Sequence, residues 1–295
     1  MRRNRSSQCL FGMILCAIVF ATGPMMHAQT PGKPTPSPTP SSPPPSLERE
    51  FFKNILRDQK AIWTSPLHLE RSDAKWMLPS GIGLMALFTT DRISGDEIAE
   101  SDRSLSASRA VSYGGSLYGV GAAAGTFYLV GRLKNNCRAR ETGVLIAEAA
   151  VDSAIVEGAL KEITQRARPA DGVERSEFFD GGSSFPSGHS IHAWALATVI
   201  ANEYKHRRAV QVAAYAMASA VSVARFTAQK HYLSDVLVGS ALGYGIGKYV
   251  YNTHHQESPA ATDDTGPEST LWWPAVSPQF NRHKHAYGVG LTWSF

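Results

Sequence analysis

The feature that most constrains this chain is a helical pattern that extends from about residue 47 to about residue 255. Apolar side chains recur there three and four positions apart, and clusters of glycine or proline separate the segments. The region lacks a run of alternating strands. We therefore expect an all-α fold, a helical bundle. The expected helices are Leu47–Lys60, Gly81–Thr90, Ser112–Leu133, Glu141–Arg166, Ser190–Tyr204, Ala209–Phe226 and Leu233–Tyr251.

The first 28 residues are typical of a secretory signal peptide. Arg2, Arg3 and Arg5 precede the apolar run Cys9–Ala21, and a short polar stretch ends near Ala28. An uncleaved membrane anchor is the alternative, although the run is shorter than the ~20 residues that a span needs. Removal of these residues takes away three arginines, so the formal net charge falls from +4 to about +1. We expect a location in the periplasm or cell envelope and no nucleic acid partner.

Composition divides the remaining chain into three parts. Residues 29–47 are a linker rich in proline, serine and threonine, which favours an extended spacer. Residues 48–255 are the helical domain, with its motif core at 141–252. Residues 256–295 are a polar linker followed by two expected strands, Leu271–Ser277 and Tyr287–Phe295. The last strand resembles the sorting signal of outer-membrane barrel proteins, but a hairpin packed on the bundle or on a partner is preferred, because a lone hairpin cannot close a barrel.

The relation of the bundle to a membrane has two possible answers. Residues 110–131 carry no charge and are long enough to span a bilayer, yet they are rich in glycine, serine and tyrosine. The helix expected at Glu141–Arg166 carries acidic residues that are costly in lipid unless they face a protein interior. An exported helical domain, open to membrane association, is favoured over an integral membrane bundle.

Three short blocks carry the chemistry, and the first is KEITQRARP at residues 161–169. Lys161 and Arg168 are seven residues apart, which returns to nearly the same side of a helix. Pro169 would end that helix, so Arg168 is expected to project from its last turn toward a ligand. The block predicts two cations that face one way, although such pairs are more often a solvated helix face.

The second block, PSGH at residues 186–189, stands directly before an expected helix. A helix N-terminus presents unpaired backbone N–H groups to an anion, and Gly188 allows the backbone to approach closely. Ser187 adds a hydroxyl donor, and His189 is placed to protonate a departing oxygen. A plain helix cap with an exposed histidine is the alternative.

The third block is ARFTAQKHYLSD at residues 224–235. His231 and Asp235 are four residues apart, so the carboxylate can accept a hydrogen bond from one ring nitrogen and leave the other free to attack. Arg225 offers a forked guanidinium to phosphate oxygens. Each block alone has an ordinary structural explanation, and their conjunction predicts a phosphate site.

Together the blocks resemble the signature of the phosphatidic acid phosphatase type 2 and haloperoxidase family. That signature reads Lys, six residues, Arg-Pro; then Pro-Ser-Gly-His; then Ser-Arg, five residues, His, three residues, Asp. The first two blocks match fully, and in the third Ala224 replaces the serine, which puts one auxiliary hydroxyl in doubt. The resemblance covers about a quarter of the chain. It implies that the phosphate is held by Lys161, Arg168, Ser187, Gly188 and Arg225, while His231 attacks phosphorus, His189 protonates the leaving alcohol and Asp235 orients His231.

The predicted function is metal-independent hydrolysis of a phosphomonoester, either a lipid phosphate or a small soluble ester, through a phosphohistidine. No cofactor is expected, and vanadate is expected to occupy the phosphate site. The alternatives are a vanadate-dependent haloperoxidase and a non-catalytic envelope scaffold or binding module. The other histidines are expected at the surface rather than as metal ligands, since the sequence groups no carboxylate or cysteine cluster with them; they include His254, His255, His283 and His285.

Overall fold

The computed structural model describes residues 47–68, 74–94, 111–169, 177–255, 275–281 and 286–292. The predicted signal peptide and nearly all of the predicted linker at 29–47 lie outside these residues, as do His283 and His285. The chain divides into two units, one ending at His255 and one formed by Gln256–Phe295.

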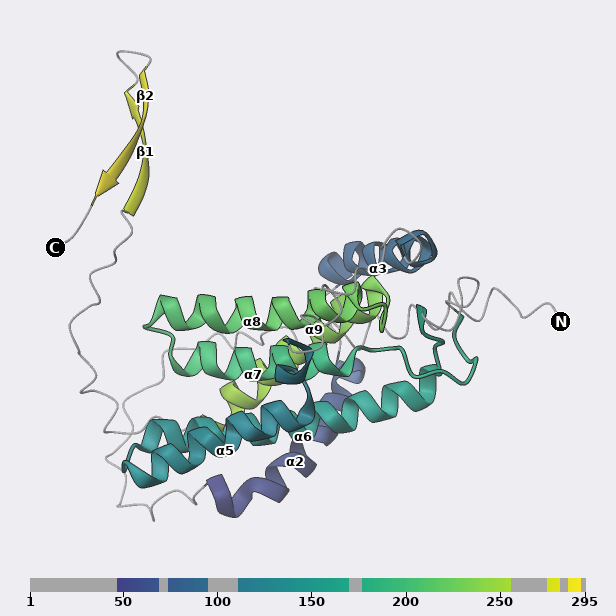
Figure 1. Cartoon of the computed structure of the whole chain (residues 1–295), viewed down its shortest axis with the longest axis horizontal. Coiled ribbons are helices and arrows are strands. Elements are labelled where there is room, and N and C mark those ends of the chain that lie inside the picture. Colours follow the sequence, from purple (N-terminus) through teal and green to yellow (C-terminus); the bar gives the residue numbers. More distant parts are fainter. Residues whose placement is uncertain are drawn as a thin grey trace. The chain divides into compact units, whose positions relative to one another are not determined.

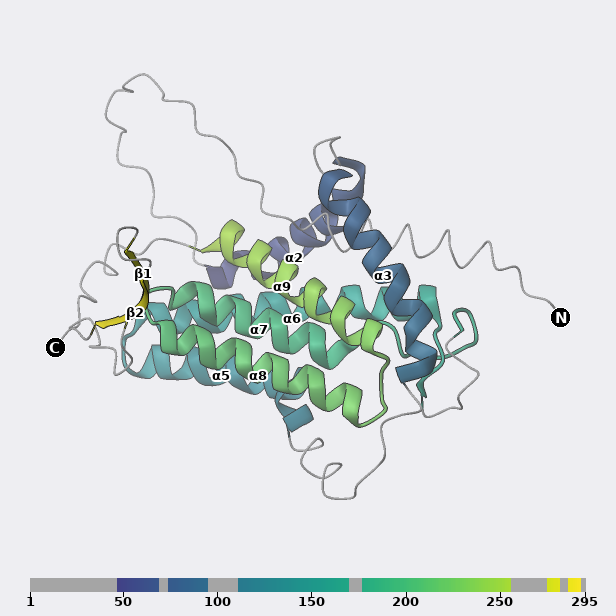
Figure 2. The same cartoon turned by 90° about the horizontal axis from the view of Figure 1, so that it is seen from above.

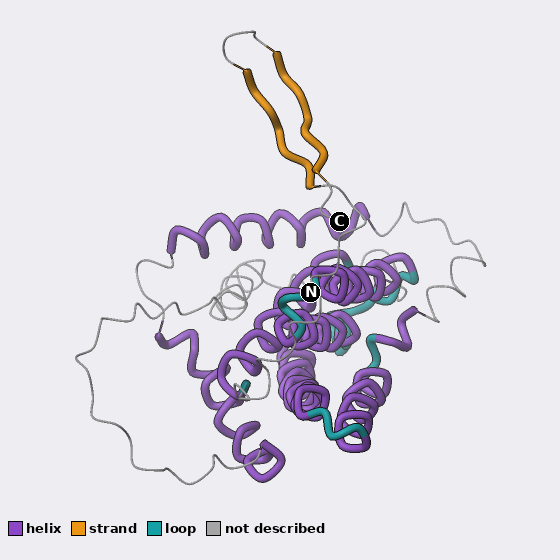
Figure 3. The backbone as a smooth tube through the Cα atoms, turned by 90° about the vertical axis from the view of Figure 1, so that its left-hand side faces the viewer, coloured by secondary structure: helices purple, strands orange, loops and turns teal. Residues whose placement is uncertain are grey.

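The first unit confirms the expected all-α bundle (Figure 1). Its long helices α5, α6, α7 and α8 run side by side and are seen nearly end-on in Figure 3. α3 crosses them at an angle near α9 (Figure 2). The described elements of this unit are α2 (Leu47–Thr64), the short 3-10 helix η1 (Ser65–His68), α3 (Ala74–Ser94), α5 (Leu117–Leu133), α6 (Cys137–Thr164), α7 (Gly188–Glu203), α8 (Arg208–Thr227) and α9 (Leu233–His254).

The core forms where α6, α7 and α9 meet. α7 packs on α9, α8 and α6, while α5 and α2 cover the outer side of α6. Glycines on α9 allow the close approach to α7, since a Cβ at Gly243 would lie 2.1 Å from the carbonyl oxygen of Ile191. The fully buried apolar side chains of this core include Val120, Leu145, Ile146, Leu160, Phe185, Ile191, Val199, Ile246 and Val250.

A polar layer inside the bundle attaches α2 to α6 and α9. His254 Nε2 lies 2.8 Å from Oδ2 of the buried Asp58. Asn54 donates to Glu148, and Gln59 donates to Asp152 at 2.8 Å. His254 is buried, so the expectation that it is a surface residue is wrong. The sequence did not indicate this contact because the carboxylate partner lies 196 residues earlier in the chain.

The observed helices differ most from the expected ones in two places: α3 begins at Ala74 rather than Gly81, and the helix expected over Ser112–Leu133 is interrupted. Residues 111–114 are helical, the chain then turns at Gly115, and α5 begins at Leu117 with Ser116 as its cap, which accepts from the Gly119 N–H. The uncharged stretch 110–131 is therefore interrupted at residues 115 and 116 and is not one continuous helix. By length and composition alone, α8 is the described helix that could cross a membrane.

The second unit contains the expected β-hairpin, formed by β1 (Ala275–Asn281) and β2 (Ala286–Thr292). The strands pair antiparallel, with Val276 opposite Leu291 and Phe280 opposite Tyr287. The first strand lies four residues later than predicted and includes Pro278. Proline is tolerated because each strand of a two-stranded sheet has an open edge, where an N–H is not needed.

Candidate functional site

Four helix ends and one loop bring the three sequence blocks together. α6 ends and α7 begins at this place, as do the end of α8 and the start of α9 (Figure 1). The antiparallel order of the helices therefore gathers blocks that are up to 74 residues apart along the sequence. Residues 165–169 and 177–187 are the described parts of the loop that joins α6 to α7.

His231 is buried at the centre of this region, with 3% of its surface exposed. Its Nδ1 donates to the backbone carbonyl of Ser184 at 2.7 Å, because a carbonyl can only accept. The proton is thereby fixed on Nδ1, and the lone pair of Nε2 faces Arg225, whose Nη2 lies 3.5 Å away. Burial lowers the pKa of His231 well below its usual value, and the charges of Arg225, Lys161 and Arg168 lower it further. The imidazole is therefore neutral and able to act as a nucleophile.

The four-residue spacing predicted a direct hydrogen bond between Asp235 and His231, and the structure does not contain it. Oδ2 of Asp235 lies 3.9 Å from Nδ1 of His231, which is too long for a hydrogen bond. Oδ2 instead accepts from the Ser184 hydroxyl at 2.5 Å and from the Tyr232 backbone N–H at 2.9 Å. Asp235 thus holds Ser184, and the carbonyl of Ser184 holds the imidazole. The spacing argument missed this path because Ser184 lies 47 residues before His231.

Arg166 is a site residue that sequence reasoning missed. Its guanidinium is 1% exposed and donates to Asp235, to Ser234 at 2.7 Å and to Asp91 of α3 at 2.8 Å. Burial lowers its pKa, but the two carboxylates outweigh burial and the pKa is raised. The guanidinium also lies 4.3–5.2 Å from the centres of three aromatic rings, those of Phe88, Phe178 and Tyr232.

Asp235 depends on this arginine for its charge. Burial raises the pKa of Asp235 to about 6, and the opposing effects of Arg166 and Ser184 keep it from rising further. No local pattern could have identified the arrangement, since Arg166 stands between the motif residues of its block and Asp91 lies 75 residues earlier. The signal in the sequence that could have indicated a buried arginine was the presence of aromatic residues near the blocks, because a buried guanidinium stacks on such rings.

Lys161 lies in the last turn of α6, where its Nζ bonds to Glu157 one turn earlier. Glu157 also lies 3.4 Å from His192 Nε2 and against the first residue of α7, where a Cβ added to Gly188 would be 1.9 Å from Oε1. The Glu157 carboxylate thus lies beside Gly188, where the sequence predicted that the backbone would approach a phosphate. The helix N-terminus and Lys161 both favour negative charge at this place.

Arg168 reaches the site from a loop, contrary to the prediction that it extends from the end of a helix. α6 ends at Thr164, and Gln165 takes a left-handed conformation with φ 44°. Arg168 therefore lies beyond the helix and does not share a helical face with Lys161. Its Nη2 donates to Ser183 at 3.2 Å, and its charge still acts on His231.

Ser187 and His189 lie at the start of α7, as predicted. Ser187 is the N-cap residue but makes no side-chain cap bond; its Oγ accepts from Ser190 at 3.1 Å. Burial, followed by the charge of Arg225, lowers the pKa of His189 to about 4. The structure thus places all eight sequence-predicted residues at one end of the bundle: Lys161, Arg168, Ser187, Gly188, His189, Arg225, His231 and Asp235.

Comparison with known proteins gives a consistent picture. Residues 142–259 match the PAP2 superfamily, and this range includes all three blocks. The chain is 33% identical over 118 residues to a lipid A 1-phosphatase of Porphyromonas gingivalis, covering 39% of this chain and 25% of that protein. It is 37% identical over 94 residues to a phosphatidylglycerophosphatase B of Bacillus subtilis, covering 28% of this chain and 44% of that protein. The chain spans less than half the length of either relative. The predicted family resemblance is confirmed.

One solved structure also aligns with the chain. It is described as the first transmembrane PAP2-type phosphatidylglycerolphosphate phosphatase, from Bacillus subtilis. The alignment covers 69% of this chain and 94% of that chain, at 19% sequence identity and a TM-score of 0.40.

Proposed function

The chain carries a PAP2 superfamily domain over residues 142–259, and we propose that this domain hydrolyses lipid phosphomonoesters through a phosphohistidine. The observation that carries the proposal is the state of His231. Its Nδ1 is engaged by the Ser184 carbonyl, so that Nε2 keeps a lone pair beside the Arg225 guanidinium. A neutral, buried and oriented imidazole is suited to attack a phosphorus atom held by cations.

In the proposed first step, His231 Nε2 attacks phosphorus in line with the departing oxygen. A P–N bond forms, the P–O bond to the alcohol breaks, and His189 gives its proton to that oxygen. Water, deprotonated by His189, then attacks the phosphohistidine and releases phosphate and free His231. Lys161, Arg168 and Arg225 balance the charge on the phosphoryl oxygens in both steps, so the mechanism requires no metal ion.

His189 must be protonated to act as an acid, although its pKa is about 4 in the structure described here. A phosphate dianion between His189 and the three cations would offset two of their three positive charges, and a negative charge directly beside an imidazole raises its pKa. We propose that substrate binding itself brings the proton to His189.

The proposed substrate class rests on the relatives and on the surface of the bundle. Both curated relatives are named for lipid phosphates. α5 and α8 also expose large apolar side chains, among them Tyr118, Leu129 and Leu133 on α5 and Val212, Met217 and Val223 on α8. Such a surface favours membrane association. We therefore propose an exported enzyme that works at the membrane of the cell envelope.

The test compares phosphatidate with an aryl phosphate as substrates, each in excess chelator, for the wild type and for His231→Ala. We expect phosphate release in chelator, preference for phosphatidate and inhibition by vanadate. His231→Ala should lose at least 1,000-fold in kcat/KM, as removal of a covalent nucleophile does. Wild-type rates in His231→Ala would refute the mechanism, and preference for the aryl phosphate would refute the lipid assignment alone.

A further inference from the structure

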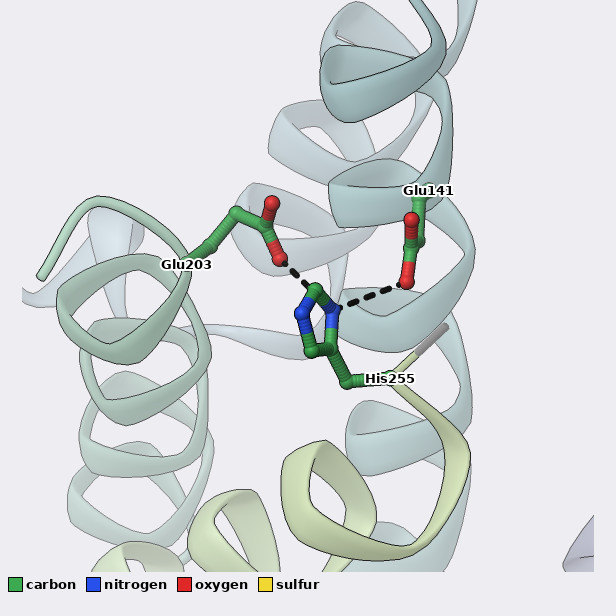
Figure 4. A group of neighbouring side chains, drawn as sticks. All are labelled: Glu141, Glu203 and His255. Atoms are coloured by element: carbon green, nitrogen blue, oxygen red, sulfur yellow. Dashed lines mark hydrogen bonds and ion pairs between the residues drawn. The ribbon is translucent and has the colours of Figure 1, made fainter. Parts of the chain in front are cut away.

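A cluster of two carboxylates and one imidazole lies at the end of the bundle opposite to the phosphate site. Glu141 is near the start of α6, Glu203 is the last residue of α7, and His255 is the C-cap of α9. Figure 4 shows the three side chains converging from these elements. Along α6, the 20 residues from Glu141 to Lys161 correspond to about 30 Å. The expectation that His255 is a surface histidine without carboxylate neighbours is therefore wrong.

Glu203 is the member of the cluster that points to a ligand. Its side chain is 3% exposed, and its Oε2 accepts no hydrogen bond from any described residue. This oxygen faces the interior of the cluster, 3.4 Å from His255 Nδ1. A buried carboxylate oxygen without a donor is costly unless a cation compensates it.

The spacing of the donor atoms suits a small metal ion. His255 Nδ1 lies 2.9 Å from Glu141 Oε1, and one ligand atom from each of the three residues lies within 4.8 Å of the others. Ligand atoms around a tetrahedral zinc ion are about 3.3 Å apart, given bonds of about 2.0 Å. Small side-chain shifts would therefore complete three bonds. The Tyr251 ring stacks on the imidazole at 4.5 Å and limits its rotation.

The net negative charge of the cluster also favours a bound cation. The two carboxylates contribute two negative charges, and Arg138 Nε lies 3.5 Å from Glu203 Oε1 and offsets one of them. Arg138 contacts Oε1 of Glu203, whereas Oε2 is the oxygen that faces His255 and the rest of the cluster. An imidazole with carboxylates is typical of zinc and related transition metals, whereas magnesium and calcium prefer oxygen ligands alone.

We propose that Glu141, Glu203 and His255 bind one divalent transition-metal cation of the zinc type. Among the described residues, they form the one group of three such ligands with this spacing. The ion joins the ends of α6, α7 and α9, and its distance from His231 makes its role structural. The proposal is independent of the phosphatase mechanism, which involves the opposite end of the same helices.

The test uses the purified full chain, freed of metal with a chelator and then titrated with zinc by calorimetry. Wild type should bind one zinc ion per chain, and its unfolding temperature should rise with zinc concentration. Glu203→Gln should weaken zinc binding at least tenfold. The matched control is Glu162→Gln, which makes the same change on an exposed part of α6 and should bind zinc as wild type does.

Equal zinc affinity in Glu203→Gln and Glu162→Gln would overturn the proposal, as would the absence of binding to wild type. X-ray absorption of zinc-loaded wild type tests the ligands without any variant, in case Glu203→Gln fails to fold. The spectrum should show oxygen and nitrogen ligands with one imidazole. A sulfur ligand would instead assign the metal to one of the three cysteines, Cys9, Cys16 or the exposed Cys137, and refute the site.

Discussion

Two arginines that stand two residues apart should fail in different ways when each is replaced by methionine. Arg166 is buried between Asp91 and Asp235, whereas Arg168 lies in the loop, donates to Ser183 and is proposed to hold the phosphate. Arg166→Met should lower the free energy of unfolding strongly. Arg168→Met should leave it nearly unchanged and lower kcat/KM by about 100-fold or more, the usual effect of removing one group that stabilises a transition-state oxyanion.

The size of the Arg166 effect follows from what the methionine leaves behind. Two carboxylates with 0% exposure lose their cation, and Ser234 loses a donor. Breaking a buried ion pair by removing one partner costs about 3–5 kcal/mol. The total stability of a domain is about 5–15 kcal/mol, so the variant should lose a large part of it. The loss should shrink as the pH falls below about 6, because Asp235 is then protonated with or without Arg166.

Urea unfolding followed by far-UV circular dichroism at pH 5 and pH 8 measures both free energies, and the aryl phosphate assay measures activity. The free energies of unfolding of the two variants should differ strongly at pH 8 and less at pH 5. Equal unfolding midpoints for Arg166→Met and Arg168→Met at pH 8 would refute it, since the buried ion pairs would then contribute nothing.

Two further substitutions are predicted to have measurable effects. Gly188→Ala places a Cβ against the Glu157 carboxylate and should displace it from Lys161, which should reduce kcat/KM at least tenfold in the same phosphatase assay; a fully active variant would show that the Glu157–Lys161 pair does not position the site. Burial raises the pKa of Asp152 to about 7, so the folded state holds a proton that the unfolded state has lost, and stability falls as the pH rises from about 4 to about 7. Asp152→Asn should remove the part of this fall that Asp152 causes and be up to about 4 kcal/mol more stable than wild type at pH 8, but similar at pH 4; urea midpoints that show the same pH dependence in both proteins would contradict it.

Local sequence was sufficient for the features that depend on spacing along one segment. Helical periodicity located α6 to α9. The close approach predicted at Gly188 was to a phosphate, and the structure places the Glu157 carboxylate there. The same reasoning failed for the end of α6, because a left-handed residue at Gln165 ends the helix four residues before Pro169. A non-glycine residue with positive φ has little sequence signature.

Contacts between distant segments could not be predicted in this way. The hydrogen bond of His231 to the Ser184 carbonyl involves a backbone atom, which any residue type provides. Asp91 reaches Ser234 across 143 residues, and nothing in its surroundings in α3 distinguishes it from a surface carboxylate. His255 likewise acquires its carboxylate neighbours only when the ends of α6 and α7 are brought together by packing.

The central claim is that His231 becomes phosphorylated on Nε2, and rapid-quench mass spectrometry tests it most directly. Full chain mixed with phosphatidate and quenched in alkali, in which phosphohistidine survives, should carry one phosphoryl group on His231. The group should be attached at Nε2, since Nδ1 is bonded to Ser184. A phosphoryl group on another residue, or turnover by His231→Ala at the wild-type rate, would contradict the account.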